Sequence, residues 1–380
     1  MLFLRGIIMK KENQTHSRSG KRRVKKKRRN KKALLFIFIP LLLLITATSV
    51  YAFNILNKAQ VAVEDAYEDD GRERSNLREY NVDPGKDHVS VLFIGVDSSE
   101  HRDNEDFALS DALILATLNK DDSSVKLLSI PRDSLVEIPA ANPESGPDIY
   151  DPNYRGKAID KITHAHAYGG SSATIGAVEN LLEIPVDYFV RLNFHAFVDV
   201  VDALGGITFD VPYEFSESDS NDRKNSIHLY PGVQKLNGEE ALAVARTRKL
   251  DSDLERGKRQ QQLMESILNK VVSFESINNL DSVIEAVGNN MGTNLRFNEM
   301  MGFASYVISG NLELEMVNME GTDLWTDLYY YQLDEAHLAE TRQLLKHHLG
   351  LIDESEMTIE VVGESEDEEL GEGLPEESWE

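Results

Sequence analysis

One apolar stretch divides the chain into two parts of very different chemistry. Residues 33–53 carry no charged side chain and, at the rise of an α-helix, are long enough to cross the hydrocarbon core of a bilayer. A run of lysines and arginines over residues 21–32 precedes the stretch, and five acidic residues follow it over residues 64–70. The positive-inside rule therefore predicts a cytoplasmic basic tail over residues 1–32 and a single transmembrane helix over residues 33–53.

The chain beyond this stretch is expected on the outer side of the membrane. A cleaved signal peptide is the alternative interpretation, with Val50-Tyr51-Ala52 as its cleavage site, and it exports the same residues. Residues 54–87 are polar and lack periodicity, which indicates an extracytoplasmic stalk. We expect a folded domain over residues 88–350. Residues 351–380 are acidic and contain no Lys or Arg, which is typical of a disordered tail.

Charge and composition exclude several classes of protein. The formal net charge is −25 although many basic residues lie in the N-terminal tail, so the exported part would repel the phosphates of a nucleic acid. The absence of cysteine excludes disulfides, thiolate nucleophiles and cysteine-ligated metals. The sequence also lacks a Walker loop, a Gly-x-Ser-x-Gly elbow and a His-Glu-x-x-His helix, which disfavours a nucleotide hydrolase, an esterase or a zinc protease.

Short apolar runs alternate with amphipathic segments along the expected domain, which predicts an α/β fold. Strands are expected over residues 89–96, 112–118, 125–130, 187–192, 207–211 and 312–317. Helices are expected over residues 172–182, 194–204, 237–245, 256–273, 281–287, 298–308 and 334–348. A loop rich in Pro, Asn, Asp and Gly is expected over residues 139–156.

Two aspartates follow this pattern at positions that suit a metal. Asp97 comes directly after the first expected strand, and Asp111 lies at the start of the second, so both carboxylates are expected at one edge of a sheet. Hard oxygen ligands of this kind suit Mg²⁺ or Mn²⁺, with phosphate oxygens and water completing the coordination shell. Ordinary turn or helix-cap roles are the alternative for both residues.

A second group follows the third expected strand, where Pro131 fixes the exit of the chain and Arg132 and Asp133 come next. Because ligands of open α/β sheets bind at strand ends, Arg132 is placed to bind a phosphate through both arms of its guanidinium group. A local ion pair between Arg132 and Asp133 is the alternative. Further along, Lys161 opens a segment that ends in Gly169-Gly170, whose backbone amides are candidate anion donors.

The third group concentrates cations in an otherwise acidic domain. On a helix, residues three and four apart share a face, which would bring Arg256, Arg259 and Gln260 together. A pyrophosphate is a natural counter-anion for such a cluster, while a solvated network with Asp251, Asp253 and Glu255 is the alternative. The cluster consists of Arg246, Arg248, Lys249, Arg256, Lys258, Arg259 and Gln260.

Six motifs in order resemble the LytR-CpsA-Psr family. They are VLFIGVDS, SDALILATLN, VKLLSIPRDS, KITHAHAYGG, VDYFVRLNFHAFVDVVDALGGITFDVP and LYPGVQKLNGEEALAVARTRKLDSDLERGKRQQQ, and they span residues 89 to 262. The resemblance implies a three-layer α/β/α sandwich with a central mixed sheet. It also implies an enzyme that moves a glycopolymer, of teichoic acid or capsule type, from a polyprenyl pyrophosphate carrier to a peptidoglycan hydroxyl at the cell membrane.

The same resemblance implies roles for particular residues. Asp97 and Asp111 match the metal-site aspartates of the family, and the cationic positions match its pyrophosphate site. Members commonly carry an arginine just before the Ser-Asp pair, where this chain has Phe107-Ala108-Leu109, and Arg102 is a candidate substitute. The residues matched to the pyrophosphate site, or lying in the same motifs, are Arg132, Lys161, Arg246, Arg248, Arg256, Arg259 and Gln260.

A mechanism follows from these assignments as a hypothesis. A metal ion held by the two aspartates bridges oxygens of the pyrophosphate. The arginines stabilise the leaving lipid phosphate, with Arg132, Arg246 and Arg248 as catalytic residues. Asp133 or Asp253 accepts the proton of the attacking hydroxyl. The lipid tail requires an apolar tunnel. A polyprenyl-pyrophosphate hydrolase, which uses water in place of the sugar, is one alternative, and a non-catalytic envelope-binding or regulatory protein is another.

Overall fold

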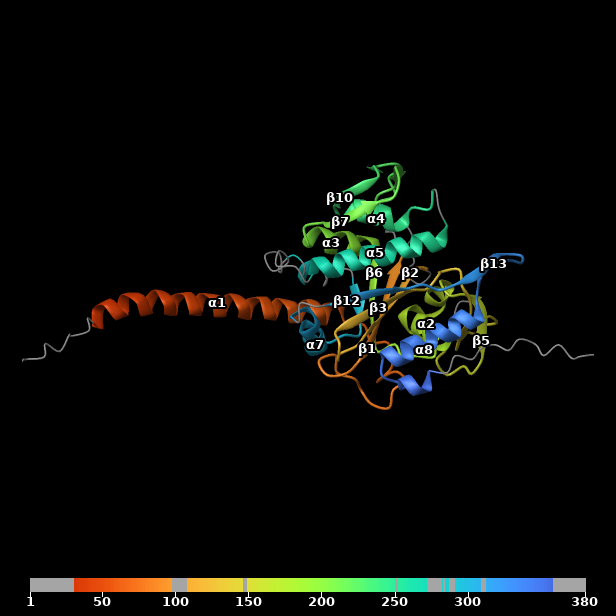
Figure 1. Ribbon diagram of the computed structural model, residues 1–380, viewed down its shortest axis with the longest axis horizontal. Coiled ribbons are helices and arrows are strands. Elements are labelled where there is room, and N and C mark those ends of the chain that lie inside the picture. Colours follow the sequence, from red (N-terminus) through yellow and green to blue (C-terminus); the bar gives the residue numbers. More distant parts are fainter. Residues whose placement is uncertain are drawn as a thin grey trace, which may run out of the picture. The chain divides into compact units, whose positions relative to one another are not determined.

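The computed structural model describes residues 31–97, 108–145, 149–249, 252–271, 282, 284–286, 291–308 and 312–357 (Figure 1). Internal contacts divide the chain into two units, residues 1–53 and 54–380. The first helix, α1 (Lys31–Ala66), confirms that residues 33–53 are helical. No helix in the described part of the chain is both long and apolar enough to span a membrane.

A six-stranded mixed sheet forms the centre of the second unit, in the order β11-β6-β1-β2-β3-β12. The pairs β1–β6 and β3–β12 are parallel, whereas β1–β2, β2–β3 and β6–β11 are antiparallel. The strands are β1 (Val89–Val96), β2 (Ser110–Leu118), β3 (Ser124–Ser129), β6 (Tyr188–Asn193), β11 (Met291–Thr293) and β12 (Glu313–Val317). The first four lie within two residues of strands expected from the apolar runs, as does β12.

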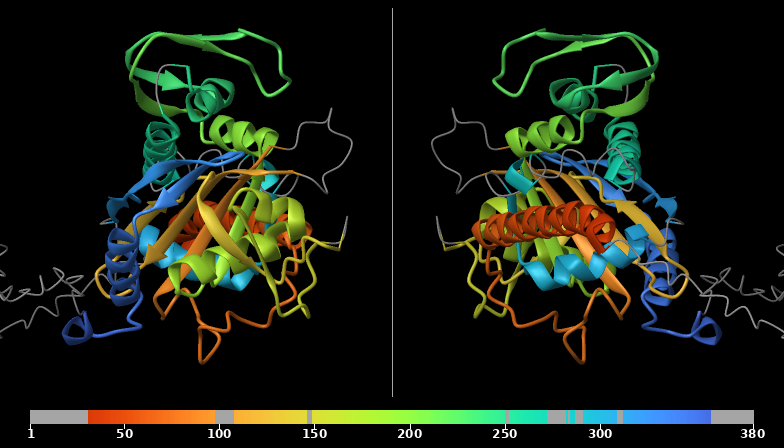
Figure 2. Two further views of the ribbon diagram at one scale, coloured as in Figure 1. Left: turned by 90° about the vertical axis from the view of Figure 1, so that its right-hand side faces the viewer. Right: turned by 90° about the vertical axis from the view of Figure 1, so that its left-hand side faces the viewer.

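Helices cover both faces of this sheet, which confirms the three-layer arrangement (Figure 2). Because side chains alternate along a strand, Leu113 and Leu115 of β2 face one layer while Ile114 and Ala116 face the other. The first layer contains α2 (His164–Leu182) and α8 (Glu335–His348). The second contains α5 (Asp253–Val271) and α7 (Phe297–Ile308).

A third hydrophobic cluster lies beyond α5 and forms a smaller lobe. There Asn237 caps α4 by accepting a hydrogen bond from the backbone of Glu240, whose side chain returns the contact. The lobe consists of α3 (Phe194–Ala203), α4 (Gly238–Arg246), β7 (Ile207–Val211), β8 (Phe215–Glu217), β9 (Ile227–Leu229) and β10 (Gly232–Leu236).

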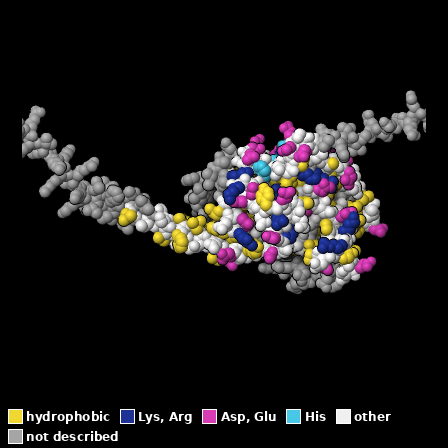
Figure 3. All heavy atoms as spheres, turned by 90° about the horizontal axis from the view of Figure 1, so that it is seen from below, with side chains coloured by type: hydrophobic (Ala, Val, Ile, Leu, Met, Phe, Trp, Pro, Cys, Tyr) yellow, Lys and Arg dark blue, Asp and Glu magenta, His cyan; other side chains and the backbone are white. Residues whose placement is uncertain are grey.

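Two hairpin-like pairs, β4 (Leu135–Pro139) with β5 (Lys157–Lys161) and β13 (Gly321–Trp325) with β14 (Tyr329–Leu333), flank the central sheet. The sequence patterns did not predict them, because their exposed and buried residues alternate too irregularly for a clear period. On the face in Figure 3, acidic and basic side chains are interspersed rather than segregated.

The segment expected as a stalk differs from that expectation. Helix α1 continues to Ala66, and Val63 and Ala66 are buried in the domain. Beyond the helix, Arg78 forms a buried ion pair with Asp187, with 2.7 Å between Nη2 and Oδ2. Residues 54–87 are thus part of the folded unit, because their few apolar side chains and charged groups find partners on the domain surface.

The bounds of some elements differ from those expected from the sequence. Helix α2 starts at His164 rather than at residue 172, and Gly169 and Gly170 form a kink within it. Within the expected acidic tail, Glu354–Glu356 forms a short 3-10 helix, and residues 358–380 lie outside the described part. The basic tail up to residue 30 and most of the helix expected at 281–287 also lie outside it.

A buried histidine joins α8 to the sheet. Nδ1 of His348 lies 2.7 Å from the hydroxyl of Thr117, and Nε2 lies 2.8 Å from the hydroxyl of Ser124. Burial, with a contribution from Lys126, lowers the pKa of His348 to about 4. The folded state therefore favours the neutral ring.

This pKa predicts a loss of stability in acid. Between pH 6.5 and 4 the unfolded chain binds more protons at His348 than the folded chain. The free energy of unfolding therefore decreases as the pH is lowered, by up to about 3 kcal/mol from this residue. His348→Gln should flatten that part of the profile measured by chemical denaturation. The exposed neighbour His347→Gln is the control, and an unchanged slope in His348→Gln would contradict the prediction.

Candidate active site

Asp97 and Asp111 lie at the same end of neighbouring strands. Asp97 directly follows β1, and its backbone amide donates a hydrogen bond to the carbonyl of Leu109 over 3.2 Å. Asp111 is the second residue of β2, which pairs antiparallel with β1, and the register shifts between Gly95 and Val96. Such an irregularity re-aims side chains at a strand end. Both carboxylates line one pocket, as the sequence predicted.

Arg132 follows β3 in a tightly fixed loop. The carbonyl of Arg132 accepts a hydrogen bond from the amide of Thr163 over 3.1 Å, and the carbonyl of Asp133 accepts one from Tyr331 over 2.8 Å. Nη1 of Arg132 donates to Oδ1 of Asp111 over 2.5 Å. The backbone contacts from the start of α2 and from β14 therefore hold the loop in the position in which Arg132 contacts Asp111.

These contacts extend into a chain of alternating charges. Nζ of Lys161 lies 2.7 Å from Asp133, and the other oxygen of Asp133 lies 3.5 Å from Nε of Arg132. Asp253, in the first turn of α5, lies 2.6 Å from Nη2 of Arg256 and 4.0 Å from Nε of Arg132. Arg132, Lys161 and Arg256 thus form ion pairs with three aspartates in a largely buried cleft.

Helix α5 carries Arg256 and Gln260 to this cleft because two neighbouring residues fit it against the sheet. The buried amide of Gln261 donates hydrogen bonds to the carbonyls of Leu127 in β3 and Val317 in β12, each over 2.8 Å. A Cβ atom at Gly257 would lie 2.8 Å from the hydroxyl of Ser129, so a larger residue would force the Ser129 side chain to move. Neither residue was predicted, because both act through contacts with strands that are distant in sequence.

Two adjoining pockets meet at these side chains. The first encloses about 1180 Å³, its open mouth included, and the second about 960 Å³. Asp111, Arg256 and Gln260 line both and mark their boundary. Apart from its polar rim, the first pocket is apolar, with Phe93, Ile94, Ile114, Leu192, Phe194, Phe197, Leu242, Leu263, Met264 and Ile267 in its wall.

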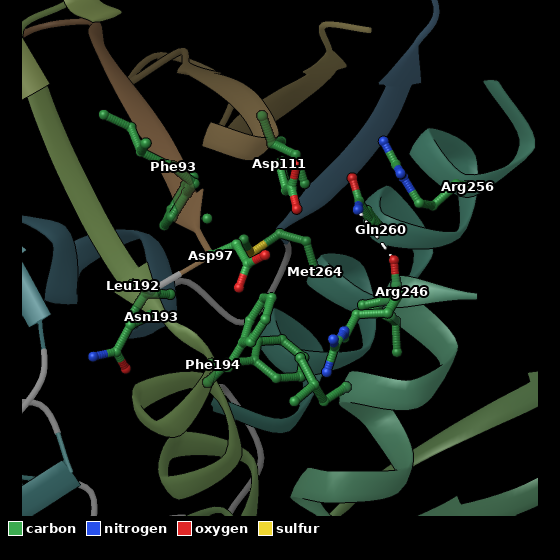
Figure 4. Close-up of a pocket in the computed structure, with 18 of the residues that line it drawn as sticks. Phe93, Asp97, Asp111, Leu192, Asn193, Phe194, Arg246, Arg256, Gln260 and Met264 are labelled. Carbon is green, nitrogen blue, oxygen red and sulfur yellow. Dashed lines mark hydrogen bonds between the residues drawn. The ribbon is translucent and has the colours of Figure 1, made fainter. Parts of the chain in front are cut away.

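Figure 4 shows how the first pocket is divided. Asp97 and Asp111 lie on the strand side, whereas Arg246, Arg256 and Gln260 extend from the helices on the other side. The guanidinium group of Arg246 stacks on the ring of Phe194, 4.5 Å from its centroid. Phe194, which the sequence analysis did not single out as a site residue, therefore fixes one of the cations at the pocket wall.

Arg256 is a buried cation with two other arginines nearby. Its side chain is 5% exposed, and its Nε is buried with no hydrogen-bond partner in the described part of the chain. Burial, opposed by Asp253 and reinforced by Arg248 and Arg132, lowers the pKa of Arg256 to about 10. It remains a cation at neutral pH, and an anion at the pocket boundary would supply the missing partner.

Arg132 differs in that burial alone would lower its pKa, but Asp111, Asp133 and Asp253 outweigh this effect and raise it. Its Nε is nevertheless buried without a hydrogen bond among the described residues. Two guanidinium groups therefore have an Nε without a hydrogen bond among the described residues, that of Arg256 at the boundary of the two pockets and that of Arg132 in the wall of the second. This arrangement favours a ligand with several anionic oxygens.

The other predicted site residues separate into two sets. Gln260 lines both pockets, and Arg246 and the exposed Arg248 line the first. Asp253 lines the second pocket, whereas Asp133 and Lys161 line neither and act on the site through Arg132. Of the stretch Phe107-Ala108-Leu109, Phe107 lies outside the described residues, as does Arg102.

Arg259 departs from the expectation that it shares a face with Arg256. Its buried guanidinium group donates to the carbonyls of Val244 and Thr247 at the end of α4, and it lines neither pocket. The reason is geometric, because residues three apart on a helix differ by about 60° in direction. Arg259 therefore faces the smaller lobe and satisfies carbonyls that α4 leaves without helical partners.

Comparisons with known proteins identify relatives of this chain in sequence and in fold. TagT of Bacillus subtilis (strain 168), which carries the name polyisoprenyl-teichoic acid–peptidoglycan teichoic acid transferase, is 39% identical over 315 residues, covering 81% of this chain and 92% of TagT. A structure described as TagT bound to LIIa-WTA matches with a TM-score of 0.59 and 37% identity, covering 73% of this chain and 97% of that one. YwtF (TagT) with bound octaprenyl pyrophosphate lipid matches with a TM-score of 0.55 and 34% identity over the same shares.

The fold and site define an α/β sandwich with a cation-lined boundary between an apolar and a polar pocket. The model of the LytR_cpsA_psr family matches residues 50–347, and this chain belongs to that family. The resemblance found in the six sequence motifs is thereby confirmed.

Substitution of Arg256 and of Arg259 should have different effects on pyrophosphate binding and on stability. Arg256→Met should abolish most of the rise in melting temperature that inorganic pyrophosphate produces, because the anion loses its buried donor. Arg259→Met should keep that rise but lower the free energy of unfolding by about 2 kcal/mol, because buried carbonyls lose their partner. Differential scanning calorimetry with and without pyrophosphate separates the two effects. Equal loss of the pyrophosphate response in both variants would contradict the assignment.

Proposed function

We propose that this protein transfers a phosphate-linked glycopolymer, of teichoic acid or capsule type, from a polyprenyl pyrophosphate carrier to a peptidoglycan hydroxyl. The observation that carries the proposal is the meeting of an apolar and a polar pocket at Asp111, Arg256 and Gln260. A prenyl chain suits the apolar wall, a pyrophosphate suits the unpaired guanidinium donors, and sugars suit the polar side. The names and bound ligands of the relatives support the same substrate class.

The chemistry assigned to the cleft is an in-line substitution at phosphorus. The acceptor oxygen forms a bond to the polymer-bearing phosphorus, the bond to the bridging oxygen breaks, and lipid monophosphate leaves with the electron pair. Arg132 and Arg256 stabilise the charge that grows on this leaving group, and Arg246 and Arg248 extend the cationic wall. Asp253 lines the polar pocket, so it is better placed than Asp133 to accept the hydroxyl proton.

Asp97 and Asp111 fit a hard divalent ion such as Mg²⁺ or Mn²⁺. Both carboxylates line the pocket beside the cations, and two such ligands suffice when phosphate oxygens and water complete an octahedral shell. Among the described residues no group of three or more His, Cys, Asp or Glu side chains could hold a metal, so the fit depends on the substrate. When bound, the ion would neutralise pyrophosphate oxygens.

This dependence gives a direct test of the metal site. We expect Mn²⁺, followed by electron paramagnetic resonance, to bind at least about ten-fold more tightly when inorganic pyrophosphate is present, because its oxygens complete the shell. Asp97→Asn and Asp111→Asn should each remove this enhancement. Asp151→Asn, at an exposed position outside both pockets, is the control. Equal Mn²⁺ affinity in all variants would contradict the metal assignment.

The basic tail and the apolar residues 33–53 support an N-terminal membrane anchor with the domain outside the cell. That placement puts the apolar pocket and the lipid carrier in the same compartment as the peptidoglycan. A lipid-pyrophosphate hydrolase would use the same cations with water as the nucleophile, so product analysis distinguishes the two activities.

The decisive experiment supplies purified full-length protein with a lipid-pyrophosphate-linked polymer, Mg²⁺ and peptidoglycan. Polymer joined to peptidoglycan by a phosphodiester is expected, and Arg132→Ala should lower kcat on the order of 10²-fold to 10³-fold by removing a cation from the leaving group. Arg155→Ala, an exposed arginine outside both pockets, should retain activity. Release of free polymer phosphate alone would favour the hydrolase, and no product of either kind would favour a binding protein.

A further inference from the structure

The polar pocket continues into a hairpin whose tip carries two aromatic side chains, Trp325 and Tyr329, that line neither pocket. Strands β13 and β14 pair antiparallel, with Trp325 opposite Tyr329, Asp323 opposite Tyr331 and Gly321 opposite Leu333. Because side chains alternate along a strand, these six residues share one face of the hairpin. Figure 1 shows β13 projecting from the edge of the domain.

This face runs without a break from the cleft to the hairpin tip. Gly321 and Tyr331 line the polar pocket at the base of the hairpin. Four residues of extended strand, about 13 Å, separate Gly321 from Trp325 at the tip. Whatever extends from the polar pocket along this side therefore meets Asp323, Tyr329 and Trp325 in order.

The side chains at the tip form an exposed aromatic platform. Trp325 is 74% exposed, and its ring centroid lies 5.0 Å from that of Tyr329. The hydroxyl of Tyr329 donates a hydrogen bond to Asp323 over 3.0 Å, which sets a carboxylate beside the rings. Nζ of Lys161 lies 5.6 Å from the Tyr329 ring and also pairs with Asp133, so the platform is joined to the charge chain that ends at Arg132.

We propose that this face of the β13–β14 hairpin binds the sugar chain of the acceptor glycan and holds its hydroxyl in the polar pocket. The inference rests on the proposed transferase function and names the acceptor subsite. Sugar rings present C–H groups that pack on the negative face of aromatic rings, while their hydroxyls bond to carboxylates at the edge. The Trp325, Tyr329 and Asp323 set supplies both kinds of contact.

Charge favours a glycan over a membrane surface as the occupant. Residues 321–333 contain Asp323 and Asp327 but no Lys or Arg. An anionic lipid surface attracts basic segments and repels such a hairpin, whereas an uncharged sugar chain is not repelled.

Binding can be tested with Trp325 as its own reporter. The chain has two tryptophans, so Trp379→Phe in the full-length protein leaves Trp325 as the single one. Titration with soluble oligosaccharides of β-1,4-linked N-acetylglucosamine, which carry no charge, should change its fluorescence in a saturable way. Tyr329→Ala should weaken the affinity at least about five-fold, as expected for an aromatic contact. Tyr230→Ala, an exposed tyrosine on the smaller lobe, should leave the affinity unchanged.

Kinetics provide a second, independent readout. Trp325→Ala should raise KM for the glycan acceptor at least about five-fold while leaving KM for the lipid substrate unchanged, and Trp325→Tyr should restore most of the acceptor affinity. An unchanged acceptor KM in Trp325→Ala would overturn the inference. So would a Trp325 signal that responds to phosphatidylglycerol vesicles and not to glycan.

The outcome also separates this inference from the proposed function. A wild-type chain that binds glycan through Trp325 but joins no polymer to it supports the hairpin site and contradicts the transferase. A wild-type chain that transfers polymer with the same acceptor KM as Trp325→Ala supports the transferase and contradicts the hairpin site.

Discussion

The cleft of this protein depends on two largely buried guanidinium groups whose N–H donors are not all satisfied by the neighbouring carboxylates. Arg132 and Arg256 share Asp253, and each retains a buried Nε without a hydrogen bond in the described part of the chain. Such an arrangement is unfavourable for the empty protein and becomes favourable when an anion enters. Burial is the main cause of the lowered pKa of Arg256, and Arg248 and Arg132 add to it. An anion with several oxygens, such as the proposed pyrophosphate, would offset this unfavourable burial.

The fold maintains this unfavourable arrangement through close packing and hydrogen bonds to backbone carbonyls. Gln261 attaches α5 to the carbonyls of β3 and β12, and Gly257 allows the helix to approach Ser129. Arg259 attaches the same helix to the end of α4. With α5 fixed on both sides, Arg256 has little freedom to move toward solvent. The rigid scaffold, rather than the charges themselves, keeps the cations close together.

The sequence was sufficient for every strand of the central sheet except β11 and for most of the cation cluster, since apolar runs and unusual local charge are strong signals. It was insufficient where a role depends on direction or on tertiary contacts. Arg256 and Arg259 are chemically alike and only three residues apart, yet one lines the pockets and the other binds backbone carbonyls. Gln261, Phe194 and the β13–β14 hairpin carry no local pattern that distinguishes them from ordinary surface or core residues. Only the packing of elements distant in sequence gives them their roles.

The division between the two pockets bears on how transfer competes with hydrolysis. In the proposed mechanism the cations act on the leaving group, so they stabilise attack by water and attack by a sugar hydroxyl equally. Selection of the sugar must therefore arise on the other side of the phosphorus, where the polar pocket meets β13 and β14. A glycan held along that face would displace water from Asp253 and place its hydroxyl in line. In this proposal the cations at the boundary of the apolar pocket set the rate at which the bond to the lipid phosphate breaks. The polar pocket and the hairpin determine whether water or a sugar hydroxyl attacks.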